Sequence, residues 1–411
     1  MKSLPKPKKI NTPVDPVARI NLLEGVRGFL ASWVMMGHFA YYLAISAILP
    51  NTAPHWLHSL VNYAKDGVTP VALFMIISGF VISHLIHSRR EHYRLYITRR
   101  FVRLFPAFLC CLILGIFISP WQHDVLASIP WSREPWIKHQ SDLALMHQNF
   151  LIQNIITHLT LLHGLVPRDW WPDSTGAFLG VGWSISTEWQ FYLIAPLFIS
   201  LSKKLSGLTF LCILLILLSP LFPAEQFFGA FQNDSRSLIF FHAQFFFLGG
   251  VSYSAWKLLR EHLAITTSLR PPPQGIALCG LALACFIPNL TLAIWTLLFA
   301  CLCQIASQPK GIESRIIEAI GCNRFTLFIG KISYSIYLVH WPMGIIVLRF
   351  WKSFPSMNWP AFVASYFIVT TLATIASATL LYYLVEAPAI RWGKKIFKEP
   401  MKLTTAGISG N

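Results

Sequence analysis

The chain has 411 residues, of which 55% are hydrophobic and only 12% are charged. A soluble protein of this length carries about 25% charged residues, so the composition excludes an ordinary soluble globular protein. The formal net charge of +16 does not predict a nucleic-acid partner, because the positions of the charges favour a membrane. Apolar runs of about twenty residues recur along the chain, which predicts an all-α, polytopic membrane bundle.

We predict ten membrane-spanning helices. The first apolar run, Val26 to about Leu49, follows a polar and basic stretch and is too long for the apolar core of a signal peptide, so it is expected to stay as the first span. The ten predicted spans cover approximately residues 26–48, 68–87, 104–120, 182–200, 205–222, 237–256, 274–288, 290–307, 332–349 and 360–384.

The basic residues divide unequally between the two sides of this arrangement. With the N-terminus in the cytoplasm, the inside segments contain 25 of the 33 Lys and Arg residues, which is the bias of the positive-inside rule. The sequence therefore predicts basic cytoplasmic tails at residues 1–22 and 391–411, on either side of a membrane domain at residues 23–390.

Residues 121–181 form a long, tryptophan-rich segment that the same rule places outside. Its apolar run FLIQNIITHLTLLHG is shorter than the roughly 17 to 25 residues of a spanning helix. A crossing there would also move every later basic loop to the outside. We therefore predict a re-entrant or interfacial piece at headgroup level, where tryptophan is enriched.

Ionisable residues inside spans are costly and usually face a bundle interior or a wet cavity, so they are candidate functional residues. The stretch EGVRGFLASWVMMGHFA contains Arg27 and His38. Eleven helical residues rise about 16 Å and return to nearly the same face, so one stripe of one helix runs from the membrane edge to mid-bilayer. The structural alternative is a snorkelling arginine and a hydrogen-bonded core histidine, but their shared face favours a functional pair.

Two further spans also have one polar face. In WSISTEWQFYLIAP, Ser184, Glu188 and Tyr192 recur every fourth residue. A carboxylate at Glu188 can orient a histidine, accept a proton, bind a sugar hydroxyl or pair with a structural arginine.

In ISYSIYLVHWP, Ser333, Tyr337 and His340 follow i, i+4, i+7 spacing. Here the alternative is that these side chains bind neighbouring helices.

A basic motif precedes the third span. In RRFVR, Arg100 and Arg103 are neighbours on a helix, and the guanidinium fork matches phosphate oxygens. The alternative is a role in topology and anionic-lipid contact.

In ISGF, Ser78 and Gly79 allow close approach of another helix. Seven of the eight cysteines lie in apolar runs, so neither a disulfide framework nor a metal site is predicted.

Together these motifs resemble the acyltransferase family 3 of integral-membrane acyltransferases. The matching features are the R-x10-H pair, the R-x-x-R motif, LFMIISGFVIS, WSISTEWQFYLIAPL, ISYSIYLVHWP and EAP at 386–388, in family order over about residues 23–390. One departure is Glu24, where members more often have Asp; the charge is kept.

The resemblance implies a ten-span bacterial inner-membrane enzyme without a permanently bound cofactor. Such enzymes move acetyl or other short acyl groups, typically from cytoplasmic acyl-CoA, to hydroxyls of surface polysaccharides, lipid-linked glycans or peptidoglycan. Some members carry a fused hydrolase-like periplasmic domain. None is expected here, so the hand-off is expected in the membrane domain or with a periplasmic partner.

The family pattern assigns expected roles to the polar residues. Arg27, Arg100 and Arg103 are expected to hold the phosphates of CoA, while the pantetheine arm carries the thioester towards His38. A neutral His38 imidazole is then a base for the acceptor hydroxyl or a nucleophile that takes the acyl group first, and Glu188 orients it or binds the acceptor sugar.

Ten spans with polar residues at mid-membrane also suit a transporter or flippase of a glycan or small polar solute. Against that alternative stands the lack of visible inverted repeats or of paired, Gly- or Pro-broken helices. A third interpretation is a non-catalytic scaffold for glycan assembly.

Overall fold

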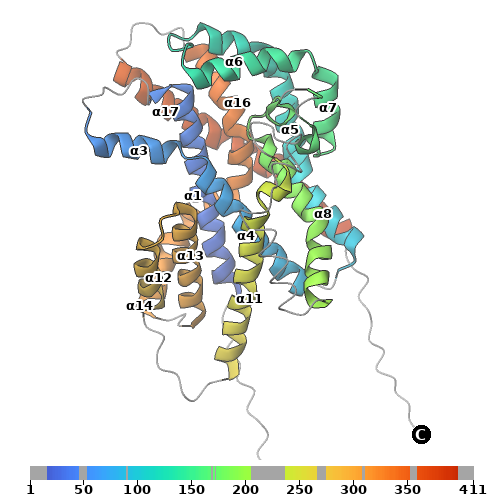
Figure 1. Ribbon diagram of the computed structural model, residues 1–411, viewed down its shortest axis with the longest axis vertical. Coiled ribbons are helices and arrows are strands. Elements are labelled where there is room, and N and C mark those ends of the chain that lie inside the picture. Colours follow the sequence, from blue (N-terminus) through green and yellow to red (C-terminus); the bar gives the residue numbers. More distant parts are fainter. Residues whose placement is uncertain are drawn as a thin grey trace, which may run out of the picture.

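The computed structural model describes residues 16–45, 53–88, 91–167, 170–171, 173–204, 237–265, 275–307, 311–351 and 359–396. Every element assigned within these ranges is a helix, in agreement with the predicted all-α class (Figure 1). Figure 1 shows α1 (Pro16–Tyr42) and α16 (Ser333–Trp351) through the middle of the molecule.

Among the described residues, four helices are long and apolar enough to cross a membrane, and each overlaps a predicted span. They are α4 (Val68–Ser88), α5 (Tyr93–Ser128), α13 (Leu290–Ser307) and the continuous helix Pro360–Ile396. A fifth candidate is the pair α15 (Arg324–Lys331) and α16, which meet at a bend of 65°.

The other predicted spans are only partly matched. Two are occupied by the long helices α8 (Gly182–Lys204) and α11 (Ala243–Ile265). At the seventh, α12 (Ile276–Cys285) has ten residues, about 15 Å of helix and half of a bilayer core. The predicted span at 205–222 lies outside the described residues, so the count of ten stays a prediction.

Several helices extend beyond the predicted boundaries, because hydropathy marks the apolar middle of a helix and not its ends. α5 begins at Tyr93 and ends at Ser128, not at 104 and 120. α1 begins at Pro16, inside the predicted tail 1–22, and ends at Tyr42. At the other end, α18 (Ala387–Ile396) carries helix into the predicted tail 391–411.

Helix α16 packs between α1, α5 and α17 (Trp359–Leu381) and forms the centre of the larger hydrophobic core. Its inner side chains, including Ile336, Leu338 and Ile345, are fully buried. At one end of the helix pair α5 and α16, the Tyr334 hydroxyl donates to the Leu104 carbonyl at 2.9 Å. At the other end, the Arg349 guanidinium lies 4.3 Å from the centre of the Trp121 ring. The two helices therefore run in the same direction, as the predicted topology requires.

A second core joins the start of α1 to α4, α11 and α13. Glycines bring α4 and α11 into close contact. A Cβ atom on Gly79 would lie 2.1 Å from the Phe246 carbonyl oxygen, and one on Gly249 would lie 2.0 Å from the Ile76 carbonyl oxygen. The expected close approach at Gly79 is therefore observed. Two further short helices are η4 (Ile239–Phe241), which precedes α11 and contacts α8, and α14 (Ile312–Gly321), which follows α13 and contacts α1.

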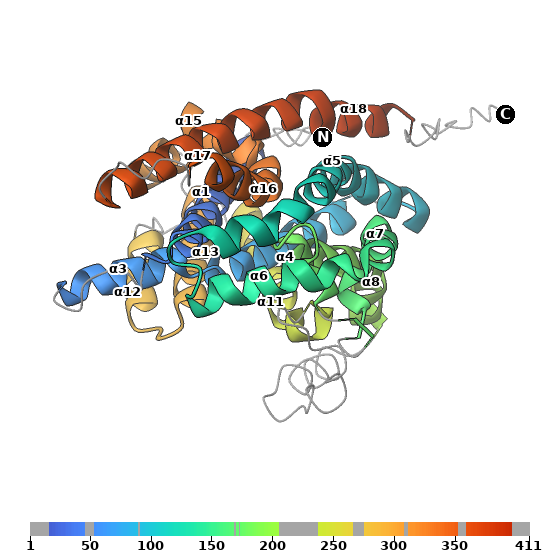
Figure 2. The ribbon, with the colours of Figure 1, turned by 90° about the horizontal axis from the view of Figure 1, so that it is seen from above.

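The described part of the predicted outside segment folds as a cap of short helices over the end of α5. It contains α6 (Pro135–Gln148), α7 (Leu151–Leu159), η1 (His163–Leu165) and η2 (Ser174–Gly176). Because α7 is nine residues long, about 14 Å, it cannot cross a membrane. Figure 2 shows α6 and α7 below α5, with α17 and α18 forming one long rod on the other side. A separate short helix, α3 (His55–Lys65), buries none of its residues.

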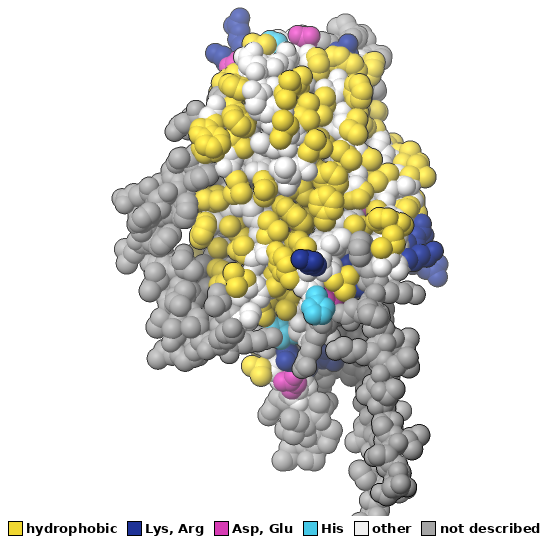
Figure 3. Space-filling view, turned by 90° about the vertical axis from the view of Figure 1, so that its right-hand side faces the viewer, with side chains coloured by type: hydrophobic (Ala, Val, Ile, Leu, Met, Phe, Trp, Pro, Cys, Tyr) yellow, Lys and Arg dark blue, Asp and Glu magenta, His cyan; other side chains and the backbone are white. Residues whose placement is uncertain are grey.

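Apolar side chains cover much of the described surface in Figure 3, and few Lys and Arg side chains interrupt them. Exposed large hydrophobic residues occur on several long helices, for example Phe117, Leu197 and Leu380. Soluble monomers rarely expose patches of this kind. The surface therefore fits a helical membrane protein.

Three buried histidines pack within the cap. The His158 and His163 rings stack in parallel, with centroids 4.0 Å apart. His163 Nε2 lies 2.9 Å from the Gly182 carbonyl oxygen, and His147 Nε2 lies 3.0 Å from that of Asp173. Burial lowers the pKa of both His147 and His163 to about 4. The pKa of His158 falls well below its usual value, first through burial and then through repulsion from His163.

Acid is expected to open this cap. Between pH 6.5 and about 4, the histidines of an unfolded cap bind protons, whereas the buried rings of the folded cap do not. The stability that these rings contribute to the folded cap is therefore complete above pH 6.5 and is lost as the pH falls. A pKa lowered from 6.5 to about 4 corresponds to about 3 kcal/mol for each of His147 and His163. Hydrogen exchange of residues 135–176 in detergent should rise between pH 7 and pH 4. A His158→Gln/His163→Gln variant should show a flatter pH dependence, and unchanged wild-type exchange would contradict this account.

Candidate active site

The first component of the candidate site is a pair of histidines on facing helices. His38 Nδ1 of α1 lies 3.2 Å from His340 Nε2 of α16. Each ring also contacts the carbonyl oxygen one turn back along its own helix, at 3.0 Å for His38 to Val34 and 3.1 Å for His340 to Ile336. His340 is fully buried, whereas His38 is half-buried. His38 is therefore the member of the pair that a ligand can reach.

These contacts define the tautomers of the neutral pair. A carbonyl oxygen only accepts hydrogen bonds, so Nδ1 carries the proton in both rings. His340 Nε2 then has a lone pair that accepts from His38 Nδ1–H. Within the described residues, His38 Nε2 has no hydrogen-bond partner, so its lone pair is available to a ligand. In this arrangement His340 accepts a hydrogen bond from the His38 ring, and the other nitrogen of that ring faces a ligand. Such a histidine suits acid–base chemistry.

A group of aromatic rings in contact with one another lies beyond His38, towards the predicted outside. The Trp341 ring meets the His38 ring edge-on at 5.3 Å and lies 5.4 Å from Tyr42 and 6.4 Å from Trp136. We call Tyr42, Trp136 and Trp341 the aromatic wall. Gly180 makes room for it, because a Cβ atom there would lie 2.4 Å from the Trp341 ring.

Polar side chains continue from the histidine pair along α8 and α16. The Ser184 and Tyr337 hydroxyls are 2.7 Å apart, and the Tyr337 ring lies 5.9 Å from His340. All three are buried. Tyr337 also lies within electrostatic range of Glu188, one turn further along α8. The predicted polar faces of the two spans therefore face each other.

Glu188 belongs to the opposite end of this polar row from His38. Its Oε1 accepts from the Tyr192 hydroxyl and, at 3.4 Å, from the Ser78 hydroxyl of α4. The expected contact in which Glu188 orients His38 is not observed, because His340 occupies that position. Periodicity along α8 identified the polar face, but it gave no information on which neighbour each residue meets.

The three predicted donor-binding arginines gather around Glu188. Arg27 lies within electrostatic range of both Arg103 and Glu188, and Arg100 within range of Arg103 and Glu188. The Arg100 guanidinium also lies 5.9 Å from the centre of the Tyr192 ring. The R-x10-H stripe of α1 therefore has an arginine cluster at one end and the histidine pair at the other.

A π-helix adds an acidic residue that the sequence interpretation did not assign. Residues Tyr382–Glu386 form the π-helix η5 between α17 and α18, a local widening that is frequent at functional sites. The Glu386 side chain is buried, accepts from the Ser335 hydroxyl at 2.8 Å and lies within electrostatic range of Arg103 and Arg27. The EAP motif contains Glu386 and was the available sequence signal, but the motif alone does not indicate which side chains Glu386 contacts.

The predicted site residues thus form two groups, and one residue, Ser333, belongs to neither. Ser184, Tyr337, His340 and His38 form one end of the polar row, and the other end contains Glu188, Tyr192 and the arginines. Ser333 is buried at the start of α16, with no contact to either group among the described hydrogen bonds. Ser78 was expected only to aid packing, and its hydrogen bond to Glu188 was not predicted. No cluster of three or more His, Cys, Asp or Glu side chains able to hold a metal occurs in the described ranges.

Comparisons with known proteins agree on one family. A family model described as an acyltransferase domain matches residues 20–379. The chain is similar to the O-acetyltransferase OatA of Staphylococcus aureus strains NCTC 8325 / PS 47, COL and MRSA252. Each is 23% identical over 371 residues, covering 83% of this chain and 55% of the relative. The chain therefore spans about half the length of the curated relatives it matches. No solved structure matches it.

Proposed function

The chain belongs to the acyltransferase family 3 of integral-membrane acyltransferases, and on that premise we propose that it transfers an acyl group from cytoplasmic acyl-CoA to a hydroxyl of an envelope or surface carbohydrate. The relatives are called O-acetyltransferases, which supports acetyl as the group and oxygen as the acceptor atom. The observation that carries the proposal concerns His38 Nε2, which has no hydrogen-bond partner among the residues that the structure describes. His340 contacts the other nitrogen of the same ring, and His38 shares its helix with Arg27. A bacterial inner membrane and an outside protein partner remain predictions.

Donor binding is assigned to the arginine cluster. Arg27, Arg100 and Arg103 present guanidinium groups suited to the phosphates of CoA, and Glu188 and Glu386 limit the repulsion among them. We therefore assign Glu188 to the donor end and not to a position behind the imidazole. Arg27 and His38 are separated by eleven residues of one helix, about 16 Å, a gap that the extended pantetheine arm bridges.

The chemical step is assigned to His38. Its Nε2 takes the proton of the acceptor hydroxyl while that oxygen attacks the thioester carbon. The carbon–sulfur bond then breaks, and the proton held on Nε2 passes to the leaving thiolate, which gives the ester and free CoA. As Nε2 becomes protonated, the ring carries a positive charge, and the lone pair of His340 Nε2 stabilises it through Nδ1–H.

The function is tested with purified protein in detergent and acetyl-CoA labelled in the acetyl group. Wild-type protein is expected to release free thiol and to place label on added envelope glycans. The same assay separates an enzyme from a transporter, because it contains no membrane compartment and no gradient. Intact acetyl-CoA after incubation with folded protein and a range of glycans would overturn the proposed donor.

Arg103→Ala is expected to weaken acetyl-CoA binding by about 10- to 100-fold, because each charge-assisted hydrogen bond contributes about 1.5–3 kcal/mol. Binding is measured by calorimetry on detergent-solubilised protein. The matched control is Arg94→Ala, which removes an exposed arginine from the same helix and should leave the affinity unchanged. Equal affinities in the two variants would return Arg103 to a role in topology and lipid contact.

A further inference from the structure

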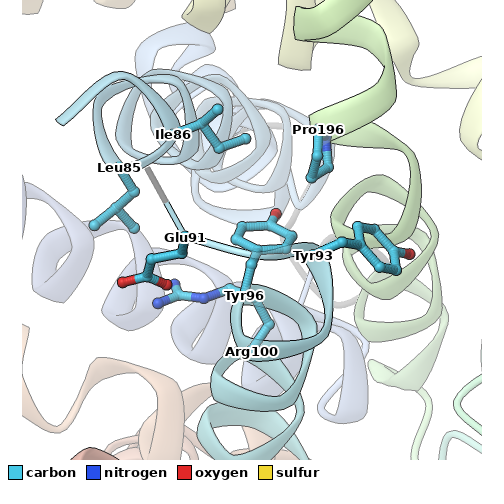
Figure 4. Close-up of a pocket in the computed structure, with 7 residues that line it drawn as sticks. All are labelled: Leu85, Ile86, Glu91, Tyr93, Tyr96, Arg100 and Pro196. Carbon is cyan, nitrogen blue, oxygen red and sulfur yellow. The ribbon is translucent and has the colours of Figure 1, made fainter. Parts of the chain in front are cut away.

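A small pocket opens where α4 ends and α5 begins (Figure 4). Its volume is about 290 Å³, at the lower end of the range for small-molecule sites, so it fits one end of a ligand and not a whole acyl donor. Its apolar lining comes from Leu85 and Ile86 of α4 and from Pro196 of α8. The predicted topology places this end of α4 in the cytoplasm.

Two tyrosines form the aromatic part of the lining. The Tyr93 and Tyr96 ring centroids are 6.5 Å apart with an interplanar angle of 39°. The Tyr93 hydroxyl donates to the Leu193 carbonyl at 3.0 Å, which fixes this ring against α8. Figure 4 shows the Tyr96 ring in the middle of the pocket, with Tyr93 and Pro196 on one side and Glu91 and Arg100 on the other. These walls suit a flat ring.

The polar atoms of the pocket are incompletely paired. The Tyr96 hydroxyl and the Arg100 Nε are both buried and have no hydrogen-bond partner in the part of the chain that the structure describes. A buried polar group without a partner destabilises the folded protein, and a ligand with acceptor atoms here would supply the missing partner. The Glu91 carboxylate on the rim is bound to Arg99 and offers an acceptor for an exocyclic amine.

Arg100 connects this pocket to the candidate active site. Its guanidinium faces the Tyr192 ring, Tyr192 donates to Glu188, and the polar row continues to the histidine pair. We propose that the pocket binds the adenine-nucleotide end of the acyl donor, with the base between the tyrosine rings and a phosphate at Arg100. This inference rests on the proposed function and names the part of the donor that sets its affinity.

A second pocket lies on the other side of the same end of α4. It has about 410 Å³ and is lined by basic and aromatic side chains, among them His84, Tyr253 and Arg260. Behind it lies the second hydrophobic core, where Phe80 packs against Tyr253 and Trp256. No polar row leads from there to His38 among the described residues, so the first pocket is the better nucleotide site.

The test compares two acetyl donors. Acetyl-CoA carries the adenine nucleotide, whereas S-acetyl-4′-phosphopantetheine keeps the thioester arm and one phosphate but lacks it. For Tyr93→Leu and Tyr96→Leu, the KM for acetyl-CoA is expected to rise about tenfold, the size of a lost base–aromatic stack. The KM and kcat for the shorter donor should stay at wild-type values, which also shows that the variants fold. Tyr253→Leu in the second pocket is the matched control and should leave both KM values unchanged.

Three outcomes would overturn the inference, and they are distinguishable from one another. An equal rise in KM for both donors would give the tyrosines a general structural role. A rise confined to acetyl-CoA in Tyr253→Leu would move the nucleotide to the second pocket. In both cases the proposed function survives, because acetyl transfer is still observed. If the wild-type protein uses neither donor, the proposed function fails together with the pocket assignment.

Discussion

His38→Ala is expected to lower kcat for acetyl transfer by about 10²–10⁴-fold, the usual contribution of a positioned acid–base group. The expectation follows from one atom. His38 Nε2 is the nitrogen of the histidine pair that lacks a partner within the described residues, and the fully buried His340 behind it cannot replace it. Acetyl-CoA binding should change little, because Arg27 of the arginine cluster lies eleven residues back along α1 from His38, about 16 Å away. The measurement is kcat and donor affinity of purified protein.

A matched control is available on the surface. His55 is exposed on α3, so His55→Ala removes the same kind of side chain without touching the polar row and should retain wild-type kcat. If His38→Ala, shown to be folded by its melting curve, also retains activity, His38 has no part in the chemistry and the mechanism is wrong.

His340→Phe is expected to lower kcat by about 10- to 100-fold, by analogy with the loss found when the outer partner that orients a metal-binding histidine is removed. Phenylalanine fills a similar volume, so the buried site stays packed. His38 keeps its own contact to the Val34 carbonyl but loses the lone pair that stabilises its protonated form. The KM for acetyl-CoA should remain unchanged.

The variant His340→Gln tests whether His340 acts by orienting His38 or only by filling space in the core. In His340→Gln, the side-chain carbonyl oxygen can accept from His38 Nδ1–H at the position of the former Nε2, so activity should recover well above that of His340→Phe. The two variants should have similar melting temperatures. Equal losses in kcat, or losses that follow melting temperature, would reduce His340 to a structural residue.

Much of this site was predictable from the sequence, because a membrane makes polar residues conspicuous. Arg27, His38 and His340 are ionisable residues in apolar runs, and helical spacing alone placed each on a definite face. The structure adds which faces meet. The contact between His38 and His340 joins residues 302 positions apart, and no local pattern contains that information.

Other features were beyond a local pattern for physical reasons. The role of Glu386 depends on a π-helical turn and on Ser335 of another helix, and the sequence shows neither. Ser78 lies in a motif with a glycine, so packing was the simpler interpretation, although its hydroxyl reaches Glu188. In the cap, His158 and His163 are five residues apart in the apolar run FLIQNIITHLTLLHG, and only the chain reversal after α7 stacks their rings.

The aromatic wall has a consequence for re-engineering the enzyme. Under the mechanism that we propose, an acyl group anchored through its donor phosphates reaches His38 with its tail towards Tyr42 and Trp341, whose rings are buried and in contact. Room for a longer tail must come from this wall, and truncating a buried aromatic side chain to alanine costs about 3–5 kcal/mol. Selectivity for chain length and resistance to unfolding therefore depend on the same side chains, so a variant with a wider tolerance should also be a less stable protein.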